Sequence, residues 1–115
     1  MAYVSVVEIV RTRRYLKDLK RIGASSADQA ALEAEIAAHP QAGDLIIGLK
    51  GLRKIRFKIG NRSKSGGARA IYLVAAFGAD RRVLMLTAYA KNEQTDLSQD
   101  QRKALLKLIK EIENG

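Results

Sequence analysis

The chain has 115 residues, of which 21 are Lys or Arg and 12 are Asp or Glu, giving a formal net charge of +9 at pH 7. This length predicts one domain, residues 1–115, with a single hydrophobic core, and the 47% apolar content argues against a disordered basic tail. The absence of cysteine excludes disulfides, cysteine-ligated zinc and thiol nucleophiles.

The positive charge is concentrated in one segment. Between Lys50 and Lys91 there are 11 basic residues and one acidic residue, Asp80, so this segment carries +10. The remaining 10 basic and 11 acidic residues carry −1 together. A positive charge gathered in this way is typical of a surface that binds a polyanion such as a nucleic acid.

Nothing in the sequence predicts export or a membrane partner. Apolar runs such as AIYLVAAF at 70–77 are too short to cross a bilayer. The N-terminus has neither the basic leader nor the cleavage site of a signal peptide. We therefore expect a soluble cytoplasmic protein.

The first predicted elements are a strand and a helix. Residues 3–10 are rich in β-branched side chains and predict a strand. Thr12 is a suitable N-cap for a helix that Gly23 ends. The apolar positions of this helix recur at spacings of three and four residues: Tyr15, Leu16, Leu19 and Ile22.

A second helix and a loop follow. Ser26 and Gln29 have the spacing of a capping box, and Pro40 closes the helix that they open. Two short helices in succession predict a hairpin that covers one face of a sheet. Three glycines between Gln41 and Gly51 predict a loop with at most one turn of helix there.

Residues 53–59 predict a strand with one basic face. Because side chains alternate along a strand, Lys54, Arg56 and Lys58 share one face. The opposite face is apolar and comprises Ile55, Phe57 and Ile59. Arg53, at the start of this strand, is a further candidate for RNA binding.

Two more strands complete a predicted three-stranded meander. A glycine-rich loop with Arg62 and Lys64 at its tip leads to residues 68–77, an apolar central strand with Arg69 at its entry. A turn at 78–81 leads to a strand at 82–91. Strict alternation groups Thr87, Tyr89 and Lys91 on one face of this strand and Leu84, Leu86 and Ala88 on the other.

The chain closes with a helix. Ser98 and Gln101 have capping-box spacing. Its apolar stripe comprises Leu105, Leu108, Ile109 and Ile112. The predicted fold class is α+β: a small, mostly antiparallel sheet made of the N-terminal strand and the meander, with an N-terminal helix hairpin and a C-terminal helix.

The residues present favour metal-independent chemistry on RNA and suggest no cofactor. The single histidine, His39, lies at a helix end, and no carboxylates have the spacing of metal ligands. RNA supplies its own nucleophile, the 2′-hydroxyl, so cleavage needs a base, an acid and cations that stabilise the transition state. Lysine and arginine can fill all three roles, and the candidates are Lys54, Arg56, Lys58, Arg69 and Lys91.

Tyr89 beside Lys91 suggests that its ring stacks on a base. Two simpler interpretations of the basic face stay open: a face that is only solvated, and one that binds phosphates without doing chemistry. Arg62 and Lys64 at a loop tip suit phosphate positioning or plain exposure to solvent.

Three ordered motifs resemble the RelE/ParE superfamily of bacterial toxins, most closely its HigB-type RelE members. They are GDLIIGLKGLRKIRF at 43–57, KSGGARAIYL at 64–73 and YAKNEQTDLS at 89–98. The resemblance implies a RelE-like fold and a ribosome-dependent endoribonuclease, an mRNA interferase that inhibits translation. The implied partners are messenger RNA on the ribosome, ribosomal RNA and a cognate antitoxin, with DNA contacted only through the antitoxin.

The resemblance also assigns roles to individual residues. Lys54 and Arg56 match a base and an electrostatic stabiliser, Arg69 matches the arginine that holds the scissile phosphate, and Lys91 matches a lysine after the last strand. The sequence departs from the pattern at Asn92, where many members have arginine, and it lacks their tyrosine near the closing helix. Tyr89 and Lys91 are the expected substitutes. ParE-like relatives inhibit DNA gyrase without cutting RNA, which is the alternative function.

Overall fold

A computed structural model describes residues 7–60, 67–77 and 80–114 of the chain. The elements follow one another as β1 (Val7–Arg11), α1 (Arg13–Ile22), α2 (Ser26–Ala38), β2 (Asp44–Leu45), β3 (Arg53–Phe57), β4 (Ala68–Phe77), β5 (Asp80–Ala90) and α3 (Gln99–Asn114). Within these residues, none of the helices has both the length and the apolar character that crossing a membrane requires.

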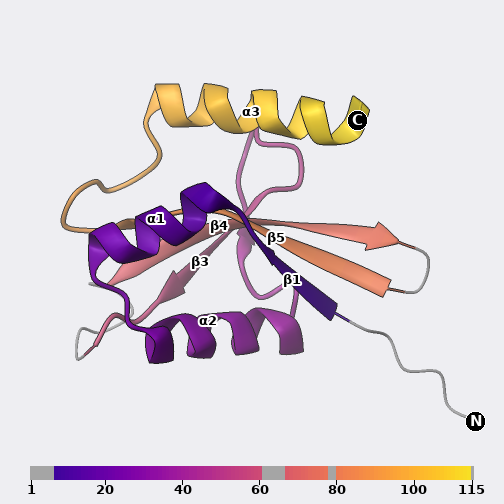
Figure 1. Cartoon of the computed structure of the whole chain (residues 1–115). Helices are drawn as coiled ribbons and strands as arrows, with labels where there is room; N and C mark the ends of the chain where they lie inside the picture. Colours follow the sequence, from indigo (N-terminus) through magenta and orange to yellow (C-terminus); the bar gives the residue numbers. More distant parts are fainter. Residues whose placement is uncertain (1–6, 61–66, 78–79, 115) are drawn as a thin grey trace, which may run out of the picture.

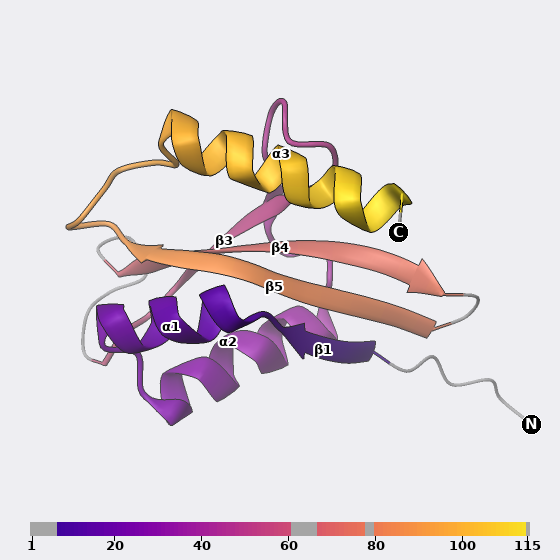
Figure 2. The same ribbon diagram turned by 45° about the horizontal axis from the view of Figure 1, so that its top comes forward.

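The strands form one five-stranded sheet in the order β1-β5-β4-β3-β2. β1 runs parallel to β5, and the other neighbours are antiparallel. Helices α1 and α2 cover one face and α3 covers the other (Figures 1 and 2). This confirms the predicted α+β class and the central place of the 68–77 strand. The prediction of a plain loop at 41–51 is wrong at Asp44–Leu45, which form the edge strand β2.

The two faces of the sheet have separate cores. Alternate residues of β3 and β4 such as Ile55 and Tyr72 pack with Leu19 and Ile36 of the helix hairpin. On the other face, Ile71 and Leu86 pack with the α3 stripe. That stripe is buried at Leu105 and Ile109, whereas Ile112 near its end is 37% exposed.

The helix ends follow the predicted signals with one correction. Thr12 caps α1, whose end is the left-handed Gly23 with φ of 80°. Ser98 and Gln101 exchange the two capping-box hydrogen bonds at the start of α3. For α2, the capping box is formed by Ser25 and Asp28, one residue earlier than predicted.

A β-bulge in β5 leaves Thr87 and Tyr89 on one face, as predicted, but changes the predicted faces of that strand at Leu86. Ile71 pairs with Thr87, but Tyr72 pairs with Met85, so Leu86 is an extra residue without a partner in β4. Tyr89 therefore joins Leu86 in the core under α3. The predicted grouping of Leu86 with Ala88 is wrong, because Ala88 packs on the opposite face.

Beyond this bulge, no strand among the described residues lies on the outer side of β5, since β1 pairs with β5 only as far as Met85. Side chains of α1 bind the backbone there instead. The Asp18 carboxylate accepts hydrogen bonds from the Ala88 N–H (3.1 Å) and the Thr87 hydroxyl (2.5 Å). Arg21 donates to the Ala88 carbonyl (3.2 Å). Helix α1 thus takes the place of a neighbouring strand.

A second buried carboxylate, Glu33 of α2, ties the hairpin to β1. It accepts hydrogen bonds from Arg11 (2.6 Å), Tyr15 (2.8 Å) and Gln29 (2.9 Å). Burial alone raises the pKa of Glu33, but these hydrogen bonds outweigh it and hold the pKa below its ordinary value. The carboxylate is therefore charged in the folded protein at neutral pH.

Candidate nucleic-acid interface

Three strands place a row of side chains across the α3 face of the sheet. Arg56 on β3 pairs with Arg69 on β4, which in turn pairs with Tyr89 on β5. Side chains in direct register lie on the same face. Tyr89 packs in the core under α3, while Ile55, the neighbour of Arg56, packs on the other face. The row therefore lies on the α3 side.

Two arginines directly opposite each other are unfavourable in a sheet, because like charges repel. Arg69 is only 7% exposed, whereas Arg56 is exposed. The guanidinium of Arg69 donates to the carbonyl of Ala68 at 3.1 Å. A buried guanidinium acts through a low dielectric, so its field on a bound phosphate would be stronger than that of a surface arginine.

Lys54 extends the basic face by one row. It pairs with Ile71, which also lies under α3. Its Nζ is 3.5 Å from the Oδ1 of Asp96, in the segment that joins β5 to α3. Lys54 lines two clefts, one of about 370 Å³ that also contains Asp96 and one of about 230 Å³ that also contains Arg56. Asp44 lines both clefts as well, so each has a mixed rather than a purely basic lining.

Asp96 is a residue of this face that the sequence analysis did not single out. The backbone N–H of Leu97 lowers the pKa of Asp96; burial opposes this, and the neighbouring Lys54 lowers the pKa further. Asp96 is thus charged at neutral pH and holds the lysine in place. The one signal for Asp96 in the sequence was its position in the YAKNEQTDLS motif. Its contact with Lys54 joins two segments that are far apart in the chain, so no local pattern predicts that contact.

Tyr89 lies in the row but not on the surface. Its side chain is 1% exposed, so the predicted stacking of a base on its ring is not possible in this conformation. Burial raises the pKa of Tyr89, nearby Asp96 raises it further, and Arg69 lowers it. Among the described residues, its buried hydroxyl has no hydrogen-bond partner. In this conformation Tyr89 therefore presents neither its ring face nor its hydroxyl to the surface.

Lys91 and Lys58 lie at the border of this face. Lys91 is exposed in the turn after β5, where its N–H donates to the carbonyl of Gly67 at 2.9 Å. Lys58 is exposed just after β3. Hydrogen bonds at the start of α2 lower the pKa of Asp28, and the charge of Lys58 contributes to this shift. The positive charge of Lys58 therefore interacts with Asp28 at the start of α2.

The other predicted RNA contacts do not join the row. Arg53 alternates with Lys54 and lies toward the opposite face, where it donates to the carbonyls of Gly43 (2.7 Å) and Gln41 (3.4 Å). Its side chain thus supports the loop before β2 rather than the basic face. Arg62 and Lys64 lie outside the described residues. His39 is the C-cap of α2.

No group of three His, Asp or Glu side chains that could hold a metal ion occurs in the described ranges. What the α3 face does hold is a set of cations: Lys54, Arg56 and Arg69. Charge-assisted hydrogen bonds from such groups bind phosphate oxygens and stabilise charge that develops on them. The arrangement is suited to a ribonucleotide backbone.

Comparison with solved structures identifies the fold. An E. coli RelE toxin with two arginine-to-alanine substitutions, in the free state, matches with a TM-score of 0.52 and 19% identity, over 76% of this chain and 86% of that one. A YoeB/ParE toxin from Agrobacterium tumefaciens matches with a TM-score of 0.51 and 17% identity, over 72% and 97%. The isolated E. coli RelE toxin matches with a TM-score of 0.50 and 19% identity, over 88% and 97%. No family profile matches the sequence.

Proposed function

We propose that this chain is the toxin of a bacterial toxin–antitoxin system, a HigB-like member of the RelE/ParE superfamily that cleaves messenger RNA on the ribosome in the cytoplasm. The fold shared with RelE and YoeB/ParE toxins supports the superfamily. The observation that carries the nuclease activity is the cross-strand row Arg56–Arg69–Tyr89 with Lys54 beside it.

In the proposed reaction, the RNA supplies the nucleophile. A base of this face removes the proton of the 2′-hydroxyl, the 2′-oxygen attacks the neighbouring phosphorus, and the bond to the 5′-oxygen breaks as an acid protonates it. Arg56 and Arg69 stabilise the negative charge on the phosphorus oxygens. Lys54 and Lys91 are the candidates for the base and the acid, because the Tyr89 hydroxyl is buried in this conformation.

The identity of the base can be tested by pH dependence. The two candidates differ in their surroundings: the Nζ of Lys54 lies 3.5 Å from the Oδ1 of Asp96, whereas Lys91 is exposed in the turn after β5. Cleavage rates measured against pH for Lys54→Ala and Lys91→Ala would show which substitution removes the ascending limb. The lysine whose loss removes that limb is the base.

Proposed partners follow from the charge. At +9, the protein should bind ribosomal RNA with a strong salt dependence, because each phosphate contact releases counterions. A cognate antitoxin would silence the toxin, and DNA would be contacted only through that antitoxin.

The decisive experiment maps RNA ends in cells that produce the chain. Primer extension should show new, codon-aligned 5′ ends with the wild type and none with Arg69→Ala. Arg81→Ala is a matched control, because Arg81 is exposed at the far end of β5 and its loss changes the charge equally. Circular dichroism of purified Arg69→Ala would establish that the variant folds. Cleavage that persists in folded Arg69→Ala would contradict the proposal.

A ParE-like gyrase inhibitor is the second candidate, favoured by the match to a YoeB/ParE toxin. Purified gyrase separates the two functions. If the chain blocks supercoiling at stoichiometric concentration and produces no new RNA ends, the gyrase function replaces the nuclease function.

A further inference from the structure

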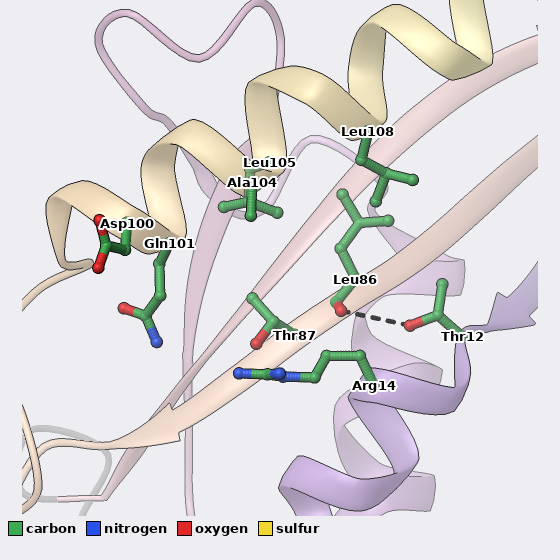
Figure 3. A pocket seen from close by; sticks show the side chains of 9 residues that line it. All are labelled: Thr12, Arg14, Leu86, Thr87, Asp100, Gln101, Ala104, Leu105 and Leu108. Atoms are coloured by element: carbon green, nitrogen blue, oxygen red, sulfur yellow. Dashed lines mark hydrogen bonds between the residues drawn. The ribbon is translucent and has the colours of Figure 1, made fainter.

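Two hollows of the surface flank the start of α3. The larger, of about 480 Å³, lies between α3 and α1 (Figure 3). Arg14, the basic residue of its lining, is ion-paired within α1, and Asp100 adds a negative charge. The smaller, of about 370 Å³, lies between Arg102 of α3, the 45–47 segment and Lys54 of the basic face. This second hollow, which we call the loop cleft, therefore adjoins the residues suited to a ribonucleotide backbone.

The lining of the loop cleft is neutral as a whole and partly apolar. Its charged side chains are two cations and two carboxylates: Lys54, Arg102, Asp44 and Asp96. Because these charges cancel, a phosphate is bound better by the neighbouring row than by the cleft itself. The rest of the lining, residues 45–47, is apolar. An uncharged group with apolar faces and a hydrogen-bonding edge suits these surroundings, and in RNA that group is the base.

Ile47 is the most exposed apolar side chain of the loop cleft, at 91%. The loop that carries it is nevertheless fixed, because Leu49 and Leu52 are fully buried in the core under α3. The Ile46 N–H donates to the Leu52 carbonyl at 2.9 Å, and Arg102 donates to the Ile47 carbonyl at 2.6 Å. The fold thus holds an isoleucine in water. A partner that covers this side chain gains from the apolar area that it removes from water.

Ile47 can supply the base contact that the tyrosines of this chain do not. Among the described side chains, four aromatic ones are buried: Tyr15, Phe57, Tyr72 and Tyr89. Bases in RNA complexes often stack on aromatic rings, but isoleucine and leucine also pack against bases. Ile47 shares the loop cleft with Lys54, which lies one row from Arg56. A base on Ile47 can therefore belong to a nucleotide whose phosphate is bound by the basic face.

We propose that the loop cleft is a nucleobase subsite, in which Ile47 packs against the face of the base and Asp44 accepts a hydrogen bond from its edge. Asp96 already accepts from Leu97 and Lys54, whereas Asp44 is exposed on the edge strand β2. A carboxylate only accepts, so bases with an exocyclic amino group are favoured over uracil, whose carbonyl oxygens it repels. The inference rests on the proposed function in placing the phosphate on the basic face.

The test measures binding of the full chain to fluorescent 2′-O-methyl oligoadenylate of about ten nucleotides, which lacks the nucleophile and cannot be cleaved. Ile47→Ala should weaken binding by about three- to tenfold, because apolar area is no longer buried. The salt dependence should not change, since no phosphate contact is lost. On a matched abasic oligonucleotide, which keeps the phosphates and lacks the bases, the variant and the wild type should bind equally. Leu16→Ala, at an exposed apolar position of α1, is the control and should bind both as the wild type does.

Three results would overturn the subsite. They are unchanged affinity of Ile47→Ala for oligoadenylate, a changed salt dependence, and an equal loss on the abasic oligonucleotide. Self-association of the wild type that Ile47→Ala abolishes, measured by analytical ultracentrifugation, would also overturn it and assign the loop to an interface between copies of the chain.

A matched pair of variants tests the contact to the edge of the base. Asp44→Asn adds a donor that uracil accepts, so the preference for oligoadenylate over oligouridylate should fall by at least about threefold. Asp100→Asn makes the same change at an exposed position of the other hollow and should leave the preference as it is. Equal preferences in the two variants would refute the contact. Base-dependent binding through Ile47 without RNA cleavage in cells keeps the subsite and removes the nuclease; cleavage with unchanged binding by Ile47→Ala does the reverse.

Discussion

Replacing Asp18 by alanine should destabilise the protein far more than an average substitution. The change leaves the Thr87 hydroxyl and the Ala88 N–H without their acceptor, at positions 7% and 1% exposed. Each unsatisfied buried group costs about 1–3 kcal/mol, so we expect a loss of about 4 kcal/mol. Arg21 keeps its bonds to Glu93 (2.8 Å) and adds little to this cost. The loss is a large part of the 5–15 kcal/mol that typically stabilises a domain.

Urea unfolding followed by circular dichroism measures this loss, and a double-mutant cycle assigns it. Thr87→Val removes the hydroxyl that Asp18→Ala would leave unsatisfied. The double variant should therefore be more stable than the sum of the single effects by about 1–2 kcal/mol. Glu111→Ala, at an exposed position of α3, is the control and should change stability by less than about 0.5 kcal/mol.

The same variant tests whether α1 holds the edge of β5. Hydrogen exchange at amides 86–90 should quicken before exchange elsewhere in the sheet, because, within the described residues, this part of β5 pairs with β4 alone and its outer side is held by α1. A loss below about 1 kcal/mol, or additive effects of Asp18→Ala and Thr87→Val, would refute the argument.

Three further outcomes are expected. The pKa of Glu33 is lower in the folded than in the unfolded protein, so the charged carboxylate stabilises the fold above about pH 5, and this contribution is lost as pH falls through the folded-state pKa. In Glu33→Gln, the free energy of unfolding measured with urea should therefore depend less on pH over this range. Gly43→Ala would place a Cβ 2.9 Å from the ring of Tyr72 and should lower the free energy of unfolding by about 1–3 kcal/mol, measured by thermal denaturation; an unchanged melting temperature would show that the loop gives way. Arg56→Ala should reduce the slope of log K against log salt for single-stranded RNA by about 0.7, whereas Arg53→Ala, on the opposite face, should not; equal slopes for the two variants would contradict the assigned faces.

The sequence predicted what local signals determine. Thr12, Gly23 and Ser98 end or begin helices because a single side chain or backbone conformation satisfies the terminal groups. Alternation within β3 placed Lys54 and Arg56 together, and the structure has them on one face. These features need only neighbours within a few residues.

Other features could not be predicted, because the local sequence does not discriminate between the alternatives. Ser25 and Ser26 are each followed three residues later by a side chain that can close a capping box, and in the structure the box forms at Ser25. The two-residue strand β2 is too short to show a period and exists because β3 lies beside it. The burial of Asp18 was not predictable, since its partners lie about 70 residues away in β5.

The bulge in β5 shows how such a non-local feature shapes the proposed site. Leu84 and Leu86 contribute to the core under α3, and strict alternation from them would place Ala88 on that side and Tyr89 on the side of α1. The extra residue Leu86 reverses the alternation, so Tyr89 comes into register with Arg69 on the α3 face while Ala88 turns toward α1. The same shift brings the Ala88 N–H within reach of Asp18. One inserted residue therefore both assembles the row of the basic face and creates the edge that α1 must hold.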